Sequence, residues 1–93
     1  MLSLVADKSC RAALAKLAPE QQAEVLVALR QLPAAFGRPH AHAGLGVRQL
    51  RRGIFEARVG LQVRILFERD GDLLVVKTLG NHDDIRRYLR ARA

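Results

Sequence analysis

The stretch GIFEARVGLQVRILFERDGDLLVVKTLGNHDDIRRYL, residues 53–89, decides the fold. Residues 55–59 and 63–67 alternate apolar and polar side chains with the two-residue period of a half-buried strand. Asp70 and Gly71 follow, and both tolerate the positive φ of a tight hairpin. Residues 73–76 form a continuous apolar run, too short for a helix, which predicts a strand buried on both faces. These segments predict an antiparallel meander with one apolar face and one face that carries arginines.

The segment before the meander predicts a short strand and a first helix. Residues 2–5 are a candidate edge strand. Asp7 or Ser9 can cap the helix that follows, because the side chains of both accept hydrogen bonds from free backbone N–H groups. The apolar stripe of this helix, with i, i+4 and i+7 spacing, consists of Cys10, Leu14 and Leu17.

A second helix is predicted to begin at Pro19, whose fixed φ suits a first turn, and to be limited by Pro33. Its apolar face consists of Val25, Leu26, Leu29 and Leu32. Because the link between the helices is tight, we expect an antiparallel helical hairpin on the apolar face of the sheet. The predicted fold is α+β: an N-terminal helical hairpin packed on a twisted antiparallel sheet of three to four strands, with a short C-terminal helix. All 93 residues are expected to form a single domain.

The region between the second helix and the meander is a loop by composition, with a plausible short strand at residues 47–52. His40 and His42 would lie on the same side of an extended segment, as half of a metal site would. No cysteine is near and no carboxylate lies within ten residues, so an incidental loop is the favoured interpretation. Gly44-x-Gly46 lacks the third glycine and the helix of a nucleotide-binding turn. The sequence therefore predicts no metal and no cofactor.

The charge of the chain predicts a polyanionic partner. The formal net charge is +7 and the pI is about 11.1, which favours binding to nucleic acid or to an acidic protein. Residues 47–93 hold eleven Lys and Arg against six Asp and Glu, whereas residues 1–46 hold five against three. Thirteen of the sixteen basic residues are arginine, whose planar fork suits phosphate oxygens better than a lysine ammonium does. The alternative is a basic, solvated surface without a specific ligand.

Three features predict a cytoplasmic protein that does not enter a membrane. The apolar runs are far shorter than the roughly 20 residues that span a bilayer. Residues 1–5 lack the basic and long apolar regions of a signal peptide. The single cysteine, Cys10, cannot form an internal disulfide, which suits a reducing compartment.

Several motifs, in their order and spacing, resemble the RelE/ParE superfamily of toxins from bacterial type II toxin–antitoxin systems. They are Leu50-x-x-Gly53, Arg58-Val59-Gly60, VRILF at residues 63–67, and Gly80-Asn81-His82. In that family a helical hairpin precedes a glycine-punctuated strand, an arginine-centred strand of the form YRhhF, and a final strand that ends in a basic or histidine-bearing segment. The resemblance covers almost the whole chain. It implies a cognate antitoxin that wraps the basic surface and covers the polar face, in a complex that often binds its own operator DNA.

The resemblance also implies an activity, and here the family divides. RelE-, HigB- and YoeB-like members are mRNA interferases that cut messages on the ribosome, whereas ParE-like members poison DNA gyrase. In the RelE-type reaction, which needs no metal, the ribose 2′-OH attacks the adjacent phosphate, which calls for a base, a cation and an acid. We expect a ribosome-dependent mRNA endonuclease. The alternatives are a non-enzymatic gyrase inhibitor and a catalytically inactive module that binds antitoxin or nucleic acid.

Position within the family pattern gives five candidate catalytic residues. Arg64 matches the arginine of the third strand, and Arg58 can join it on the polar face to bind the scissile phosphate. His82 stands where HigB- and YoeB-like toxins carry a histidine, whose titration range suits proton transfer near neutral pH. Tyr88 has the spacing of a RelE-like tyrosine that stacks on a base or orients the phosphate. Glu56 is a candidate base, as a carboxylate is in YoeB-like members.

Each candidate also has a structural interpretation. Glu56 can form an ion pair with Arg58, and Arg64 can pair with Glu56 or Glu68. His82 can bond the turn beside a helix cap formed by Asp83 or Asp84, and Tyr88 can pack against its helical neighbours.

The sequence departs from the family pattern in three places, one of which is a first strand shorter than usual. RelE carries lysines on the strand that here is residues 54–57, where none is present, and Val63 stands where an aromatic residue is usual. Further arginines are candidates for binding RNA or the antitoxin: Arg48, Arg51, Arg52, Arg86, Arg87 and Arg90.

Overall fold

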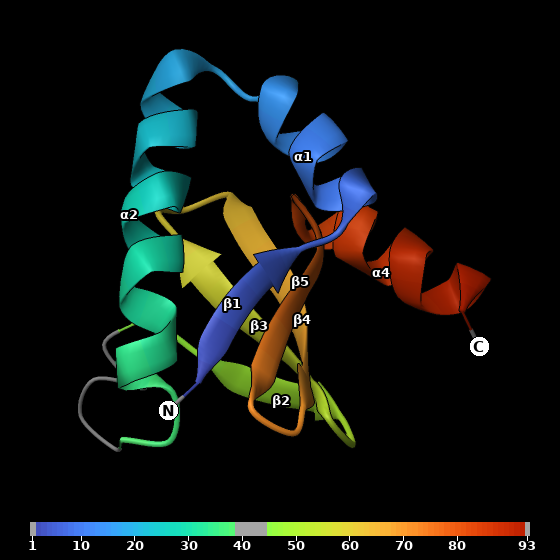
Figure 1. The fold of residues 1–93 in the computed structure, drawn as a ribbon. Helices are drawn as coiled ribbons and strands as arrows, with labels where there is room; N and C mark the ends of the chain where they lie inside the picture. Colours follow the sequence, from blue (N-terminus) through green and yellow to red (C-terminus); the bar gives the residue numbers. More distant parts are fainter. Residues whose placement is uncertain (1, 39–44, 93) are drawn as a thin grey trace.

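A five-stranded mixed sheet forms the centre of the fold, and helices pack on both of its faces (Figure 1). The computed structural model describes residues 2–38 and 45–92. The strand order is β1-β5-β4-β3-β2, with β1 parallel to β5 and every other neighbouring pair antiparallel. The strands are β1 (Ser3–Ala6), β2 (Arg48–Arg51), β3 (Ile54–Val59), β4 (Val63–Asp70) and β5 (Leu73–Gly80).

The α+β prediction is confirmed, but the number of strands and their directions differ from it. The predicted sheet had three to four antiparallel strands, whereas the structure has five and β1 is parallel to its neighbour. β1 and β2 are only four residues long. Pairing between β1 and β5 joins segments about 70 residues apart, from Ser3 opposite Leu73 to Ala6 opposite Val76, and no local pattern encodes it.

Glycines at positive φ shape the hairpin turns of the meander. Gly60 (φ 63°) follows β3, and Gly71 (φ 58°) follows β4. Asp70 pairs with Leu73, so the loop between β4 and β5 is Gly71 and Asp72. The predicted turn at Asp70 and Gly71 is therefore displaced by one residue, because Asp70 still belongs to the ladder.

A β-bulge at Lys77 ties β5 to the first helix, α1 (Lys8–Ala15). Leu66 pairs with Thr78 and Phe67 with Val76, which leaves Lys77 as the extra residue. Its ammonium lies 3.3 Å from the Asp7 carboxylate, and its carbonyl accepts a hydrogen bond from the Ser9 hydroxyl. Asp7 is the N-cap residue, yet its side chain forms no capping hydrogen bond. Both residues predicted as caps thus hold α1 against β5 instead.

Helices α1 and α2 (Pro19–Ala35) pack on one face of the sheet, α1 against β5 and α2 against β1 and β3. Figure 1 shows them as an inverted V rather than as two helices side by side. α2 begins at Pro19 as predicted, but it continues through Pro33 to Ala35. Pro33 lacks the backbone N–H that would bond the carbonyl of Leu29, and the helix ends two residues after it. None of the helices in the described ranges is long and apolar enough to cross a membrane.

The main core lies between these two helices and the sheet. It contains Cys10 of α1, Val25 and Leu32 of α2, and Ile65 and Phe67 of β4, each at most 1% exposed. The predicted stripes of α1 and of the meander therefore face the core. Burial raises the pKa of the Cys10 thiol, which keeps it protonated at neutral pH.

The buried face of α2 differs from the predicted one by a rotation. Ala28 and Ala35 are buried beside Val25 and Leu32, whereas Leu26, predicted to face the core, is 42% exposed. The buried face of α2 therefore combines two alanines with Val25 and Leu32, and hydrophobicity alone did not identify it.

The last helix, α4 (His82–Ala91), packs on β4 and β5. Side chains alternate along a strand, so Glu56, Arg58 and Arg64 point away from the main core toward the opposite face. Leu66 on that face and Ile85 of α4 are at most 2% exposed, and neither belongs to the main core. We infer that they form a small second core, which leaves the arginine-bearing part of this face open.

Two leucines of α2 test its orientation. Leu32→Ala should lower the free energy of unfolding by about 2–5 kcal/mol, because the side chain is 1% exposed and its loss leaves a cavity. Leu26→Ala should change it by less than about 1 kcal/mol. Urea unfolding monitored by circular dichroism measures both, and equal losses would contradict the burial described for α2.

Candidate functional site

Three arginines and a histidine surround a hollow of about 440 Å³ on the open face of the sheet. Its lining residues are Gly46, Val47, Arg48, Arg58, Arg64 and His82. We call it the arginine hollow. The sequence predicted Arg58, Arg64 and His82 as catalytic candidates and Arg48 as an RNA- or antitoxin-binding residue, and the structure brings these four together.

Two cross-strand rows place the side chains. Arg58 on β3 lies directly opposite Arg64 on β4, and Arg64 lies opposite Gly80 on β5. In the neighbouring row, Arg48 on β2 lies opposite Glu56 on β3. Residues directly opposite in an antiparallel pair have Cβ atoms about 4.5–5.5 Å apart, so like charges there are destabilising. The Arg58–Arg64 pair therefore favours an anion between the two guanidinium groups.

A buried carboxylate holds two of the arginines. Oε1 of Glu56 accepts hydrogen bonds from Arg64 at 2.8 Å and from Arg48 at 3.2 Å. The side chain of Glu56 is 2% exposed, that of Arg64 17% and that of Arg48 59%. The Glu56–Arg64 pair, one of the possibilities raised by the sequence, is present, whereas the suggested pair with Arg58 is not. Arg58 forms no ion pair with any residue in the described part of the chain.

A helix cap places His82 at the rim of the hollow. Asn81 is the N-cap residue of α4, and its Oδ1 accepts a hydrogen bond from the backbone N–H of Asp84 at 2.9 Å. Oδ2 of Asp84 accepts in return from the backbone N–H of Asn81 at 2.9 Å. A Cβ at Gly80 would lie 2.5 Å from that Oδ2, so this geometry requires glycine. The sequence had suggested Asp83 or Asp84 as the cap; Asn81 caps the helix and Asp84 completes the box.

His82 is the first residue of α4, and its side chain is exposed. Within residues 2–38 and 45–92, no side chain or backbone group forms a hydrogen bond with its imidazole. The suggested bond to the turn is thus not formed by the described groups, and the ring is accessible from the hollow.

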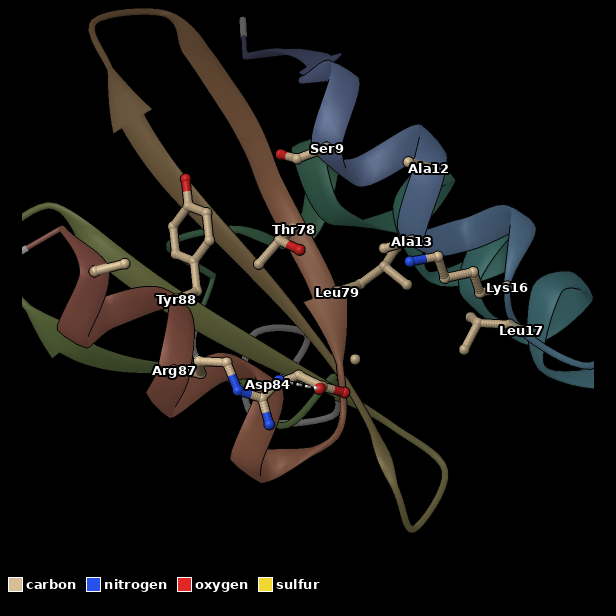
Figure 2. A pocket seen from close by; sticks show the side chains of 12 residues that line it. Ser9, Ala12, Ala13, Lys16, Leu17, Thr78, Leu79, Asp84, Arg87 and Tyr88 are labelled. Carbon is tan, nitrogen blue, oxygen red and sulfur yellow. Dashed lines mark hydrogen bonds and ion pairs between the residues drawn. The ribbon is translucent and has the colours of Figure 1, made fainter.

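Tyr88 lies in a different place, a groove of about 640 Å³ between α1 and α4. Figure 2 shows it on the α4 side of this groove, across from Ser9 and Ala12 of α1. It lies six positions after His82, a rotation of about 240° around a helix, so the two side chains do not share a face. Its hydroxyl accepts a hydrogen bond from Arg92 at 2.8 Å, which raises the pKa of that guanidinium. The structure therefore separates Tyr88 from the arginine hollow.

The remaining predicted basic residues do not line the hollow. Arg51, the last residue of β2, and Arg52, in the turn that follows, are both exposed. Arg86 and Arg90 are exposed on α4, and Arg87 pairs with Asp84 at 3.1 Å. His40 and His42, which were considered as half of a metal site and interpreted as part of an incidental loop, lie outside the described residues, as does Gly44. The described residues hold no group of three or more potential metal ligands.

Comparison with solved structures identifies the architecture as that of RelE-like toxins. The RelB–RelE antitoxin–toxin complex of Methanococcus jannaschii matches with a TM-score of 0.68 and 14% identity, over 90% of this chain and 96% of that one. The toxin–antitoxin complex RelBE2 of Mycobacterium tuberculosis matches with a TM-score of 0.63 and 24% identity, over 87% and 98%. YafQ of E. coli matches with a TM-score of 0.64 and 11% identity, over 91% and 98%. No protein-family model matches the sequence, and no curated protein matches it significantly.

Removing the charge of Glu56 tests its place beneath the arginines. Glu56→Gln should lower the free energy of unfolding by about 1–3 kcal/mol, because it weakens two charge-assisted hydrogen bonds in a buried position. Glu24→Gln, the same change at an exposed position on α2, is the control and should have little effect. Urea unfolding of the two variants measures the difference, and equal stabilities would show that Glu56 is not held as described.

Proposed function

We propose that this protein is the toxin of a type II toxin–antitoxin system and that it cuts ribosome-bound mRNA. The observation that carries the proposal is the Arg58–Arg64 pair, two cations held opposite each other with an exposed histidine on the same hollow. Such a site suits a phosphodiester that bridges the two guanidinium groups, since charge-assisted, two-pronged contacts to phosphate are strong and directional. The RelE-like fold supports the same assignment.

In the proposed reaction the ribose 2′-OH attacks the adjacent phosphorus. The O2′–P bond forms, the P–O5′ bond breaks, and the products carry a 2′,3′-cyclic phosphate and a 5′-OH. Arg58 and Arg64 stabilise the negative charge that builds on the phosphoryl oxygens in the transition state. His82 donates a proton to O5′ as it leaves, because it is the exposed imidazole that lines the hollow and a protonated imidazole can act as a general acid. The proton of the 2′-OH passes to water.

We assign Glu56 a positioning role instead of the role of general base. Its side chain is 2% exposed and its Oε1 already accepts from Arg48 and Arg64. A general base must come within hydrogen-bond reach of the proton that it removes. A buried carboxylate beneath the guanidinium groups does not meet that condition, but it fixes the direction in which Arg64 presents its other N–H groups.

We further infer that the cognate antitoxin occupies the groove between α1 and α4. Its walls carry small side chains that permit close approach. Ala12 and Ala13 lie on α1 (Figure 2), and Ala91 of α4 also lines the groove. Lys16, Arg87 and Asp84 also line it, and Asp84 pairs with Arg87, which leaves the charge of Lys16 for an acidic residue of an amphipathic segment. In two of the similar structures the toxin is in complex with its antitoxin.

Two substitutions in the hollow test the endonuclease. Arg64→Ala should lower the rate of mRNA cleavage about 10²–10³-fold, by loss of transition-state charge stabilisation. His82→Ala should lower it about 10²–10⁴-fold, by loss of proton transfer. The control is Arg30→Ala, which removes an exposed arginine of α2 and should leave cleavage unchanged. The measurement is primer extension on cellular messages after induction in a growing bacterium, with discrete new 5′ ends inside translated frames expected for the wild type.

Other outcomes of that experiment identify the alternatives. Growth arrest with intact messages and induced DNA damage would assign the chain to the gyrase inhibitors, for which His82→Ala should be silent. Neither arrest nor cleavage would leave a binding module without catalysis.

A charge placed in the groove tests the antitoxin site. Ala12→Glu puts a carboxylate among the groove residues and should weaken binding of the adjacently encoded antitoxin at least tenfold, by repulsion of its acidic segment and by steric conflict. The control, Ala15→Glu, makes the same change at an exposed position of α1 that does not line the groove, and should bind normally. Titration calorimetry measures both affinities, and equal affinities would place the antitoxin elsewhere.

A further inference from the structure

A second, smaller hollow adjoins the arginine hollow. Its volume is about 260 Å³, and it lies between the turn that joins β3 to β4 and the first turn of α4. Its lining residues are Leu61, Gln62, Arg64, Asn81, His82 and Asp83. Arg64 and His82 line both hollows. A polynucleotide whose phosphate lies against Arg58 and Arg64 therefore places a neighbouring nucleotide at the second hollow.

The chemistry of the second hollow differs from that of the first. In place of Arg48 and Arg58 it has one carboxylate, Asp83, and two amides, Gln62 and Asn81. Asp83 is exposed and forms no ion pair with any residue that the structure describes. A carboxylate repels a phosphate but accepts hydrogen bonds from the amino groups of bases. This hollow thus suits the base of a nucleotide better than its phosphate.

The two amides and an exposed leucine complete a surface that suits a nucleobase. Oδ1 of Asn81 is occupied by the backbone N–H of Asp84, so its amide group is left as a donor toward the hollow. Gln62 is exposed and offers both a donor and an acceptor. Leu61 is 92% exposed at the tip of the turn, which is unusual for a large apolar side chain beside a charged site. An apolar side chain packs against the flat face of a base, while amides and a carboxylate bind its edge.

We propose that the second hollow is a nucleobase subsite for one of the two nucleotides that flank the scissile phosphate. The subsite disfavours uracil, because Asp83 accepts from the exocyclic amino groups of adenine, cytosine and guanine. Uracil has no amino group and presents carbonyl oxygens on both sides of its single N3–H, so it meets the carboxylate with repulsion. This proposal rests on the endonuclease function proposed above and adds to it a preference at one position.

The test uses reporter messages that differ only in the bases flanking one strong cleavage site, each set in turn to A, C, G or U. The wild type should cut at least tenfold less when uracil occupies one of the two flanking positions. Asp83→Asn gives the hollow an amide that can donate to the O4 of uracil, and should reduce that difference to threefold or less. Asp72→Asn, the same change in the exposed turn before β5, should keep the wild-type preference.

The ratio of the cleavage rates at different bases distinguishes a base subsite from an indirect effect through His82. Asp83 lies next to His82, and a change in the protonation of that histidine would alter cleavage at all four bases by the same factor. Unchanged base ratios in Asp83→Asn, or a wild type that cuts all four bases equally, would overturn the subsite while the endonuclease stands. A wild type that cuts no message would overturn both proposals.

Discussion

The hydrogen bonds between the buried carboxylate of Glu56 and the guanidinium groups of Arg48 and Arg64 are the interaction on which the polar face depends. A buried charge is tolerated only when it is paired and hydrogen-bonded. Because the partners come from β2 and β4, this carboxylate on β3 cross-links three adjacent strands. The carboxylate also offsets the repulsion between the arginine charges on this face, where Arg58 lies opposite Arg64 and has no counter-ion among the described residues.

The second constraint is the entry into α4. The strand ends at Gly80, where the absence of a side chain leaves room for the carboxylate of Asp84 and for the reciprocal cap with Asn81. This cap fixes the first turn of α4 and therefore the position of His82, two residues after Gly80, which lies opposite Arg64. The arginine pair and the histidine thus share a site because two features occur at the same place. The strand register sets Arg58 opposite Arg64, and the helix cap after β5 sets His82 beside them. Neither feature alone would bring them together.

Local sequence patterns predicted much of this arrangement. The two-residue alternation in residues 55–59 and 63–67 placed Arg58 and Arg64 on the polar face, and the apolar stripe of the first helix placed Cys10 in the core. The parallel pairing of β1 was missed because it depends on a contact between distant segments. Leu26 was placed in the core because it is more hydrophobic than Ala28, although the structure buries the alanine and leaves Leu26 42% exposed.

The candidate site was predicted in part for similar reasons. The position of each residue in the family pattern identified the candidate site residues. The partners of Glu56, however, depend on the register of three strands, which a single sequence does not determine. Tyr88 was grouped with His82 by its spacing from the last strand, although six residues along a helix turn the two side chains to different sides. The sequence does not identify Leu61 as exposed. An apolar residue is also expected in a strand, and only the three-dimensional structure shows that this one lies at the tip of a turn.

The chemistry of the ends left by cleavage tests the central claim most directly. The proposed attack by the 2′-OH, with charge stabilised by Arg58 and Arg64, produces a 2′,3′-cyclic phosphate on one fragment and a 5′-OH on the other. Ligation-based mapping of messages cut by the purified protein on translating ribosomes distinguishes these ends from others. We expect upstream fragments that resist ligation until the cyclic phosphate is opened and removed, and downstream fragments that require phosphorylation. Fragments with 3′-OH and 5′-phosphate ends would contradict the account, because they arise when water, not the ribose, attacks the phosphate.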